Sequence, residues 1–121
     1  AYGWIVVYLV LRGLSALGLI PEPLAVHALT IGAIGGMTIG MMARTSRGHT
    51  GRTLRADRFD VACFLLVFAA AIVRVFGGMI MSGAYRTTVI VSGICWSTGF
   101  ALFTIRYWPV LSRARIDGKP G

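Results

Sequence analysis

Two histidines and three methionines are the candidate metal ligands of this sequence. They lie in one apolar segment, HALTIGAIGGMTIGMMARTSRGHTGR, which begins at His27, ends just beyond His49 and contains Met37, Met41 and Met42. Imidazole nitrogen commonly binds iron and copper, and thioether sulfur favours copper. Plainer alternatives stay open from the sequence: His27 as an interfacial histidine bonded to a neighbouring helix, His49 as a solvated loop residue, and the methionines as packing groups.

Two arginines, Arg12 and Arg74, interrupt otherwise apolar runs. A guanidinium deep in a membrane span costs at least about 2.5–3.5 kcal/mol on insertion scales, so each arginine needs a partner. Counting about 1.5 Å per helical residue places both at a similar depth, roughly a turn below His27. No acidic residue is expected at that depth. The counter-charge is therefore expected on an absent segment or on a ligand such as a porphyrin with its propionates, with carbonyl hydrogen bonding at helix ends as the alternative.

The composition indicates a membrane protein. The 121 residues are 56% hydrophobic and 13% charged, and the mean hydropathy is +0.76, whereas soluble domains carry about 25% charged residues. The net charge of +8 does not indicate nucleic-acid binding, because the basic residues are not interleaved with aromatic side chains for base stacking. The chain opens at Ala1 inside an apolar run, so we expect it to be a portion of a longer protein.

Four apolar runs have the length of about 20 residues that a transmembrane helix requires. The predicted fold is therefore an all-α, polytopic transmembrane bundle with spans at residues 2–20, 24–43, 60–81 and 88–108. The Pro21-Glu22-Pro23 turn joins the first two spans, and Asp57 and Asp60 suit the capped start of the third. Cys63 and Cys95 fall at different predicted depths, so no disulfide is expected between them.

The distribution of basic residues predicts the orientation of the bundle. Nine of the twelve lie in or beside loop 44–59 and tail 109–121. Because cationic segments near span ends stay in the cytoplasm, both are expected there, with the Pro-Glu-Pro turn outside. The aromatic residues expected at the interfaces are Tyr2, Trp4, Tyr107 and Trp108 on the inner side and Tyr85 on the outer side.

The second span carries two distinct faces. Ala28, Gly32, Gly36 and Gly40 form a stripe of small residues typical of close helix packing. The opposite face carries His27, Thr30, Ile34, Thr38 and Met41 and is free for another role. His27 lies near the N-terminal end of its helix, where the helix dipole favours the neutral, metal-binding imidazole.

The segment from His27 to Arg52 resembles the signature segment of the NnrS family, which are polytopic bacterial inner-membrane proteins associated with the response to nitric oxide. Three other pieces agree with this resemblance: YLVLRGLSALG with Arg12, LLVFAAAIVRVFG with Arg74, and the C-terminal FALFTIRYWPVLSRARIDGKPG. The resemblance covers essentially the whole chain, and its first segment is the most specific.

The resemblance implies that the chain is the C-terminal portion of a larger protein of the bacterial inner membrane with haem b and copper as cofactors. By resemblance, His27 and His49 are metal ligands, Met41 and Met42 stay candidate copper donors near His49, and Arg12 and Arg74 are expected to pair with haem propionates. The expected partners are the lipid bilayer, nitric oxide and upstream transmembrane helices.

Three interpretations of function follow. The first is a haem- and copper-binding protein of nitric oxide response or nitrosative stress protection, with enzymatic turnover left open. The second is a secondary transporter or channel fragment, in which Arg12, Arg74 and His27 line an anion or proton pathway, although no inverted repeat is visible. The third is a structural membrane subunit without a cofactor. Catalytic triads and phosphate-binding loops are absent from the sequence.

Overall fold

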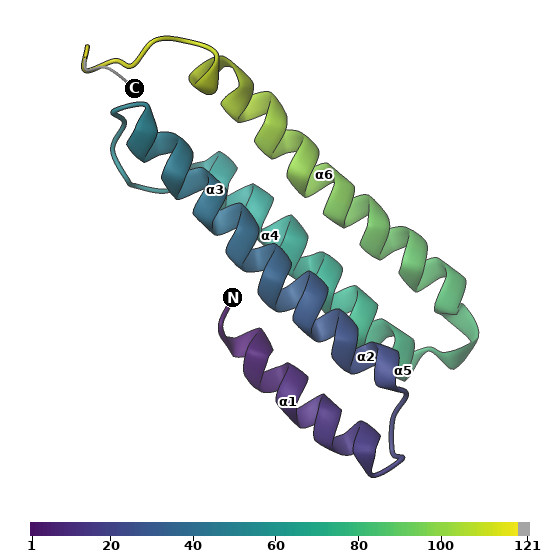
Figure 1. Ribbon diagram of the computed structural model, residues 1–121. Coiled ribbons are helices and arrows are strands. Elements are labelled where there is room, and N and C mark those ends of the chain that lie inside the picture. Colours follow the sequence, from purple (N-terminus) through teal and green to yellow (C-terminus); the bar gives the residue numbers. More distant parts are fainter. Residues whose placement is uncertain (119–121) are drawn as a thin grey trace.

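The chain folds into antiparallel helical segments that stand side by side (Figure 1). The computed structural model describes residues 1–118, and this part of the chain contains no β-strand. In chain order the elements are α1 (Gly3–Ala16), α2 (Glu22–His27), η1 (Ala28–Gly35), α3 (Gly36–His49), α4 (Arg58–Ile72), η2 (Val73–Gly77), α5 (Gly78–Ile80), η3 (Ser82–Ala84) and α6 (Tyr85–Leu111). The prediction of an all-α bundle is confirmed.

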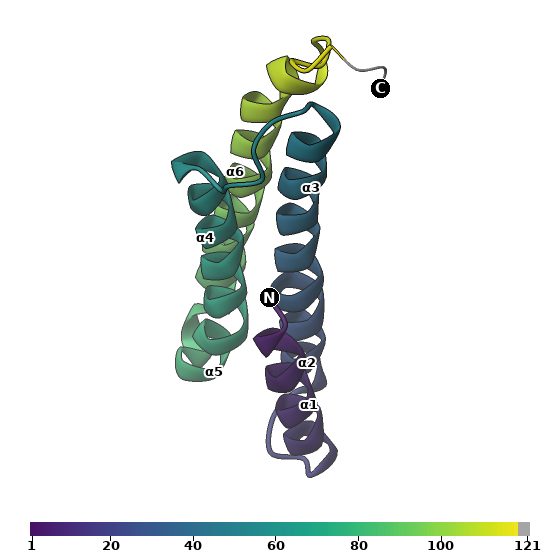
Figure 2. The ribbon, with the colours of Figure 1, turned by 90° about the vertical axis from the view of Figure 1, so that its left-hand side faces the viewer.

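Three continuous helices are long and apolar enough to cross a membrane. They are Glu22–His49, which joins α2, η1 and α3, Arg58–Ile80, which joins α4, η2 and α5, and α6 at Tyr85–Leu111. Helix α1 is apolar but has only 14 residues in this structure, fewer than the roughly 20 that a membrane requires. It packs along α2 and η1, and its first residues lie about halfway along that long helix (Figures 1 and 2).

A Schellman motif ends α1 four residues before the predicted end of the first span. Gly18 has φ +71°, its N–H donates to the carbonyl of Ser15, and the N–H of Leu19 donates to the carbonyl of Leu14. These two bonds satisfy the last carbonyl groups of the helix, and a residue without a Cβ adopts the left-handed conformation most easily. The early end brings Arg12 to about one turn from the helix terminus.

The same motif ends α3 and corrects the predicted boundary of loop 44–59. Gly51 also has φ +71°, its N–H donates to the carbonyl of Gly48, and the N–H of Arg52 donates to the carbonyl of Arg47. The helix therefore continues six residues beyond the predicted span. His49, predicted in a loop, is the last residue of α3.

The small-residue stripe of the second span packs as predicted over most of its length. Ala28, Gly32 and Gly36 are buried, and a Cβ atom at Gly32 would lie 2.4 Å from the ring of Trp4 on α1. Gly35 lies outside the stripe and is equally close to α6, because a Cβ atom there would lie 2.4 Å from the ring of Trp96. At Gly40 no atom lies within 4 Å of that position. The glycines thus admit two indole rings against the helix backbone, which is how small residues permit close contact in membranes.

The predicted aromatic belt is only partly correct. Trp4 and Tyr107 are buried among the helices, with exposed fractions of 5% and 3%. Trp4 packs edge-on against Phe68 of α4, with 5.6 Å between ring centroids. Trp108 and Tyr85 are exposed near the two ends of α6, as interfacial aromatic residues are. Tyr2 is also exposed, but the neighbouring Ala1 packs beside Gly36, halfway along the Glu22–His49 helix, so Tyr2 does not lie at the predicted inner interface.

The opposite face of the second span is open, as predicted. Thr30, Ile34, Thr38 and Met41 are exposed in the described chain.

Both cysteines are free, which agrees with the expectation of no disulfide. The bundle has two ends, which we call the turn end (the connection 17–21 and η3) and the arginine-loop end (residues 50–57 and 112–118).

Replacing Gly32 with alanine tests the packing of α1. We expect Gly32→Ala to lower the free energy of unfolding by about 1–3 kcal/mol, because the new methyl group overlaps the buried indole ring of Trp4. Gly40→Ala is the matched control, since its methyl group enters open space on the same helix. Denaturation in detergent micelles measures both, and equal stabilities would contradict the observed packing.

Candidate functional site

His27 is held in one tautomer by a backbone carbonyl at the turn end. Its Nδ1 lies 2.5 Å from the carbonyl oxygen of Pro23, one turn earlier in α2. A carbonyl oxygen only accepts hydrogen bonds, so Nδ1 carries the proton and donates. In the neutral imidazole, Nε2 is then the nitrogen with a lone pair, through which a histidine binds a metal, and metal-ligating histidines usually donate their other nitrogen in this way.

His27 lines a cavity of about 470 Å³ between the Glu22–His49 helix and the Arg58–Ile80 helix. Arg74 of η2 and Tyr85 of α6 line the same cavity, so the structure brings His27 and Arg74 together as the sequence analysis expected. The other lining residues are mainly apolar: Leu19, Ile20, Pro21, Pro23, Leu24, Gly78 and Met79. A mostly apolar cavity with a few polar groups is typical of cofactor and ligand sites.

Arg74 has an aromatic partner in place of an acidic one. A terminal nitrogen donates to the hydroxyl oxygen of Tyr85 at 3.2 Å, and the guanidinium carbon lies 5.2 Å from the centroid of the same ring. Both contacts orient the guanidinium but leave its positive charge in place. Among residues 1–118, no carboxylate forms an ion pair with Arg74. The positive charge of its guanidinium is therefore not neutralised at this cavity.

The expectation that no acidic residue lies near the two arginines of the apolar runs is wrong for Arg12. Its guanidinium donates to the carboxylate of Glu22, the first residue of α2, and both side chains are more than half exposed. The expectation was wrong because α1 ends at Ala16, which places Arg12 near the turn end within reach of Glu22. Arg12 does not line the His27 cavity.

Two π-helical segments lie at this cavity. The eight-residue segment η1 begins directly after His27, and the five-residue segment η2 contains Arg74. Each wider turn shifts the direction of the side chains relative to a regular α-helix. Such segments are rare and frequently occur at functional sites, and here η2 contributes Arg74 to the cavity lining while η1 begins directly after His27.

The candidate copper ligands are distributed over two surfaces of α3. Met41 and His49 line one shallow cavity, whereas Met42 lines another cavity on the α6 side with Tyr107 and Trp108. Met41 and His49 are eight residues apart, a rise of about 12 Å along a helix. Within residues 1–118 no group of three His, Cys, Asp or Glu side chains is close enough to hold a metal.

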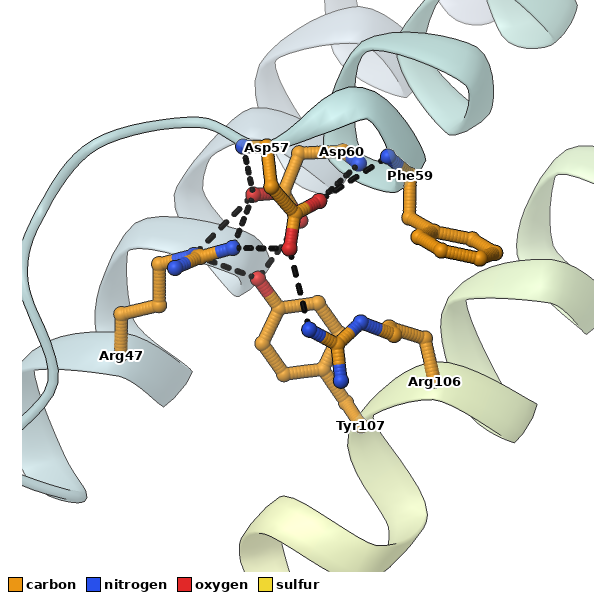
Figure 3. A network of polar contacts seen from close by, with 6 residues as sticks. All are labelled: Arg47, Asp57, Phe59, Asp60, Arg106 and Tyr107. Atoms are coloured by element: carbon orange, nitrogen blue, oxygen red, sulfur yellow. Dashed lines mark hydrogen bonds and ion pairs between the residues drawn. The ribbon is translucent and has the colours of Figure 1, made fainter.

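The arginine-loop end contains a polar network that the sequence analysis did not anticipate (Figure 3). Asp60, with a side chain 6% exposed, pairs with Arg47 of α3 at 2.7 Å and accepts a 2.6 Å hydrogen bond from the hydroxyl of Tyr107 on α6. Asp57 pairs with Arg47 at 2.6 Å and with Arg106 at 3.0 Å. The network thus connects α3, α4 and α6.

The two carboxylates also cap α4, as predicted. Asp57 accepts hydrogen bonds from the backbone N–H groups of Phe59 and Asp60, and Asp60 accepts one from the N–H of Asp57. This capping box satisfies otherwise unpaired donors. Burial alone would raise the pKa of Asp57, but the hydrogen bonds from the Asp60 N–H, Arg106 and Arg47 together lower it to about 2.

Local sequence signals predicted the cap but not the partners. An aspartate three residues before another aspartate at the start of an apolar run is a recognisable helix start. Arg47 is 13 residues before Asp60 and Tyr107 is 47 residues after it. Only the packing of three helices identifies these partners. The only indication in the sequence that these carboxylates have basic partners was the small number of acids, four against twelve basic residues.

Neutralising Asp60 tests the network. We expect Asp60→Asn to destabilise the fold by about 3 kcal/mol, because Arg47 loses its most buried counter-charge. Tyr107→Phe removes one hydrogen bond and should cost about 1 kcal/mol. The control is Asp117→Asn, which alters the ion pair with Arg115, two residues away, and is expected to cost less than about 1 kcal/mol. A thermal unfolding series that ranks Asp117→Asn with Asp60→Asn would contradict this assignment.

The lowered pKa of Asp57 predicts a dependence of stability on acid. Because the pKa is about 2 in the fold and 3.8 ordinarily, the stabilisation is complete above about pH 4 and is lost as the pH falls from 4 to 2. We expect this stabilisation to be about 1–2 kcal/mol, since the Asp57 side chain is partly exposed and solvent screens its charge. The difference in unfolding free energy between wild type and Asp57→Asn should shrink over that range, and a constant difference would refute the coupling.

Comparison with known proteins identifies the family of the chain. No functionally curated protein and no solved structure matches the chain. The family model described as NnrS protein matches residues 1–115, which is nearly the whole chain. The chain therefore belongs to the NnrS family of membrane proteins.

Proposed function

We propose that this chain is part of a haem- and copper-binding membrane protein that acts in nitric oxide response or nitrosative stress protection. Membership of the NnrS family supports the assignment to nitric oxide. Haem iron and copper supply the chemistry, because both metals bind nitric oxide directly. The proposed location is the bacterial inner membrane, with the arginine-loop end in the cytoplasm, since basic residues gather at that end.

The observation that carries the haem proposal is the state of His27. Its Nδ1 is committed to the Pro23 carbonyl, and its side chain lines a cavity that Arg74 also lines. An axial haem ligand needs a neutral imidazole of fixed orientation, and a haem carries two propionates that need cationic partners. The residues present therefore fit one axial ligand and one propionate partner.

Arg74 is the proposed propionate partner on the basis of its contacts. Tyr85 holds the guanidinium through its hydroxyl group and ring without neutralising it. Arg12 is a weaker candidate than the sequence alone indicated, because Glu22 already pairs with it. The assignment of copper to His49, Met41 or Met42 stays a proposal that rests on the ligand chemistry of these side chains. Further ligands for either metal would have to come from outside residues 1–118.

Metal and haem quantification on variants tests these assignments. We expect the intact protein, purified from membranes, to show a Soret band that His27→Ala abolishes together with most of the iron, because the axial imidazole is removed. Arg74→Gln should retain the ligand spectrum but lower the affinity for haem about tenfold, the effect of one charge-assisted bond. His49→Ala should retain the iron and lower the copper content.

The controls separate failure of the site from failure of the function. Arg86→Gln changes an exposed arginine of the turn end that does not line the cavity, and it should leave haem content unchanged. Full haem occupancy in His27→Ala would refute this ligand while leaving the haem proposal intact. A purified protein without any Soret band or copper would refute the cofactor proposal and favour a transporter or channel.

A further inference from the structure

The arginine-loop end has more cations than the chain can neutralise. Among residues 1–118, eight of the eleven basic residues lie at or beside this end, against three of the four acids. All three carboxylates are engaged: Asp57 and Asp60 by Arg47 and Arg106, and Asp117 by Arg115. Anions from outside the chain must balance the remaining cations.

Arg44 differs from the other surplus arginines because it borders a cavity. This exposed residue of α3 forms no ion pair with any carboxylate among residues 1–118. It lies at the rim of a groove of about 430 Å³ between α3 and α4. Arg44 is five residues from the end of α3, about 8 Å along the helix, which is the depth at which arginine side chains extend toward the membrane surface.

The groove itself is largely apolar. Ile39, Phe64 and Phe103 form part of its lining, and Gly40 and Val61 are exposed on opposite walls. Arg47 and Asp60 also line it, but they pair with each other at 2.7 Å. Gly40 keeps the groove open, since no atom lies within 4 Å of the position that a Cβ would take. Because both walls belong to membrane-spanning helices, the groove has the dimensions and surroundings to admit hydrocarbon.

A second, more polar depression continues from the groove. It is lined by Thr45, Gly48 and His49 of α3, and it shares Arg44 and Leu54 with the groove. The two cavities therefore meet at Arg44. Together they form a surface that is apolar toward the middle of the helices and cationic toward their end, which matches a ligand with a hydrocarbon chain and an anionic head.

We propose that this groove binds one anionic phospholipid, with its phosphate at Arg44 and an acyl chain along Gly40 between α3 and α4. Clusters of arginine directly beside transmembrane helices favour anionic lipid headgroups. A free soluble anion would be held by the arginine but would gain nothing from the apolar groove. The site lies at the opposite end of the bundle from His27 and does not depend on the haem proposal. Its polar depression is also lined by Met41 and His49, the candidate copper ligands.

Two substitutions test the two parts of the site. Gly40→Leu fills the groove with a side chain that the open position accommodates, and Arg44→Gln removes the charge at its rim. The intact detergent-purified protein is titrated with phosphatidylglycerol, and bound lipid is measured by native mass spectrometry. We expect each substitution to weaken the binding of phosphatidylglycerol about tenfold, and we expect phosphatidylcholine and glycerol phosphate to bind at least tenfold more weakly to wild type.

The matched controls are Gly93→Leu and Arg55→Gln. Gly93 is also exposed with open space around it but lies on α6 away from the groove, and Arg55 is an exposed loop arginine that does not line it. Both controls should bind phosphatidylglycerol as wild type does. Equal losses in Arg55→Gln and Arg44→Gln would show diffuse surface charge and overturn the proposal. So would unchanged binding in Gly40→Leu, equal affinity for phosphatidylcholine, or equal affinity for glycerol phosphate.

Discussion

The carboxylate of Asp60 joins three helices at one point, and the arrangement of the arginine-loop end depends on it. It caps α4, neutralises Arg47 of α3 and accepts the hydroxyl hydrogen of Tyr107 on α6 (Figure 3). A buried charge is tolerated only when partners replace the lost water, and this carboxylate has a full set. The partners come from different helices, so satisfying the charge requires the helices to meet in one arrangement. The network therefore selects a structure more than it adds stability.

At the turn end, by contrast, the positive charge of Arg74 is not neutralised by a carboxylate. Arg74 is oriented by a tyrosine, which stabilises a cation without neutralising it. The imidazole of His27 is fixed through one nitrogen and leaves the other available. A structural network pairs its charges within the chain, as Asp60 and Arg47 do, whereas a binding site keeps some groups available for a ligand. This difference in partners is why the turn end is the better candidate for a cofactor, although the arginine-loop end has more charged residues.

Properties that depend on local sequence were predictable. Apolar run length identified the long helices, and the Asp57 and Asp60 spacing identified the start of α4. The helix ends were misplaced because the predicted bounds followed the apolar runs, whereas Gly18, inside an apolar run, and Gly51, in a polar segment, end their helices through positive φ angles. The Gly-x-x-Pro pattern after α1 could have indicated the end of that helix. Proline soon after a glycine cap is typical of helix ends, and Gly18 precedes Pro21 by three residues.

Partners distant in the sequence were not predictable, and one misplaced helix end changed the chemistry inferred for a residue. With α1 extended to residue 20, Arg12 lay deep in a span and required a ligand as counter-charge. With α1 ending at Ala16, Glu22 reaches it from the next helix. Arg74 shows the contrasting outcome, because its helix continues past it to Ile80 and no carboxylate of the described chain pairs with it. Two arginines that looked equivalent in sequence therefore differ in what they can still bind. The difference arises from backbone capping about one turn away rather than from the arginines themselves.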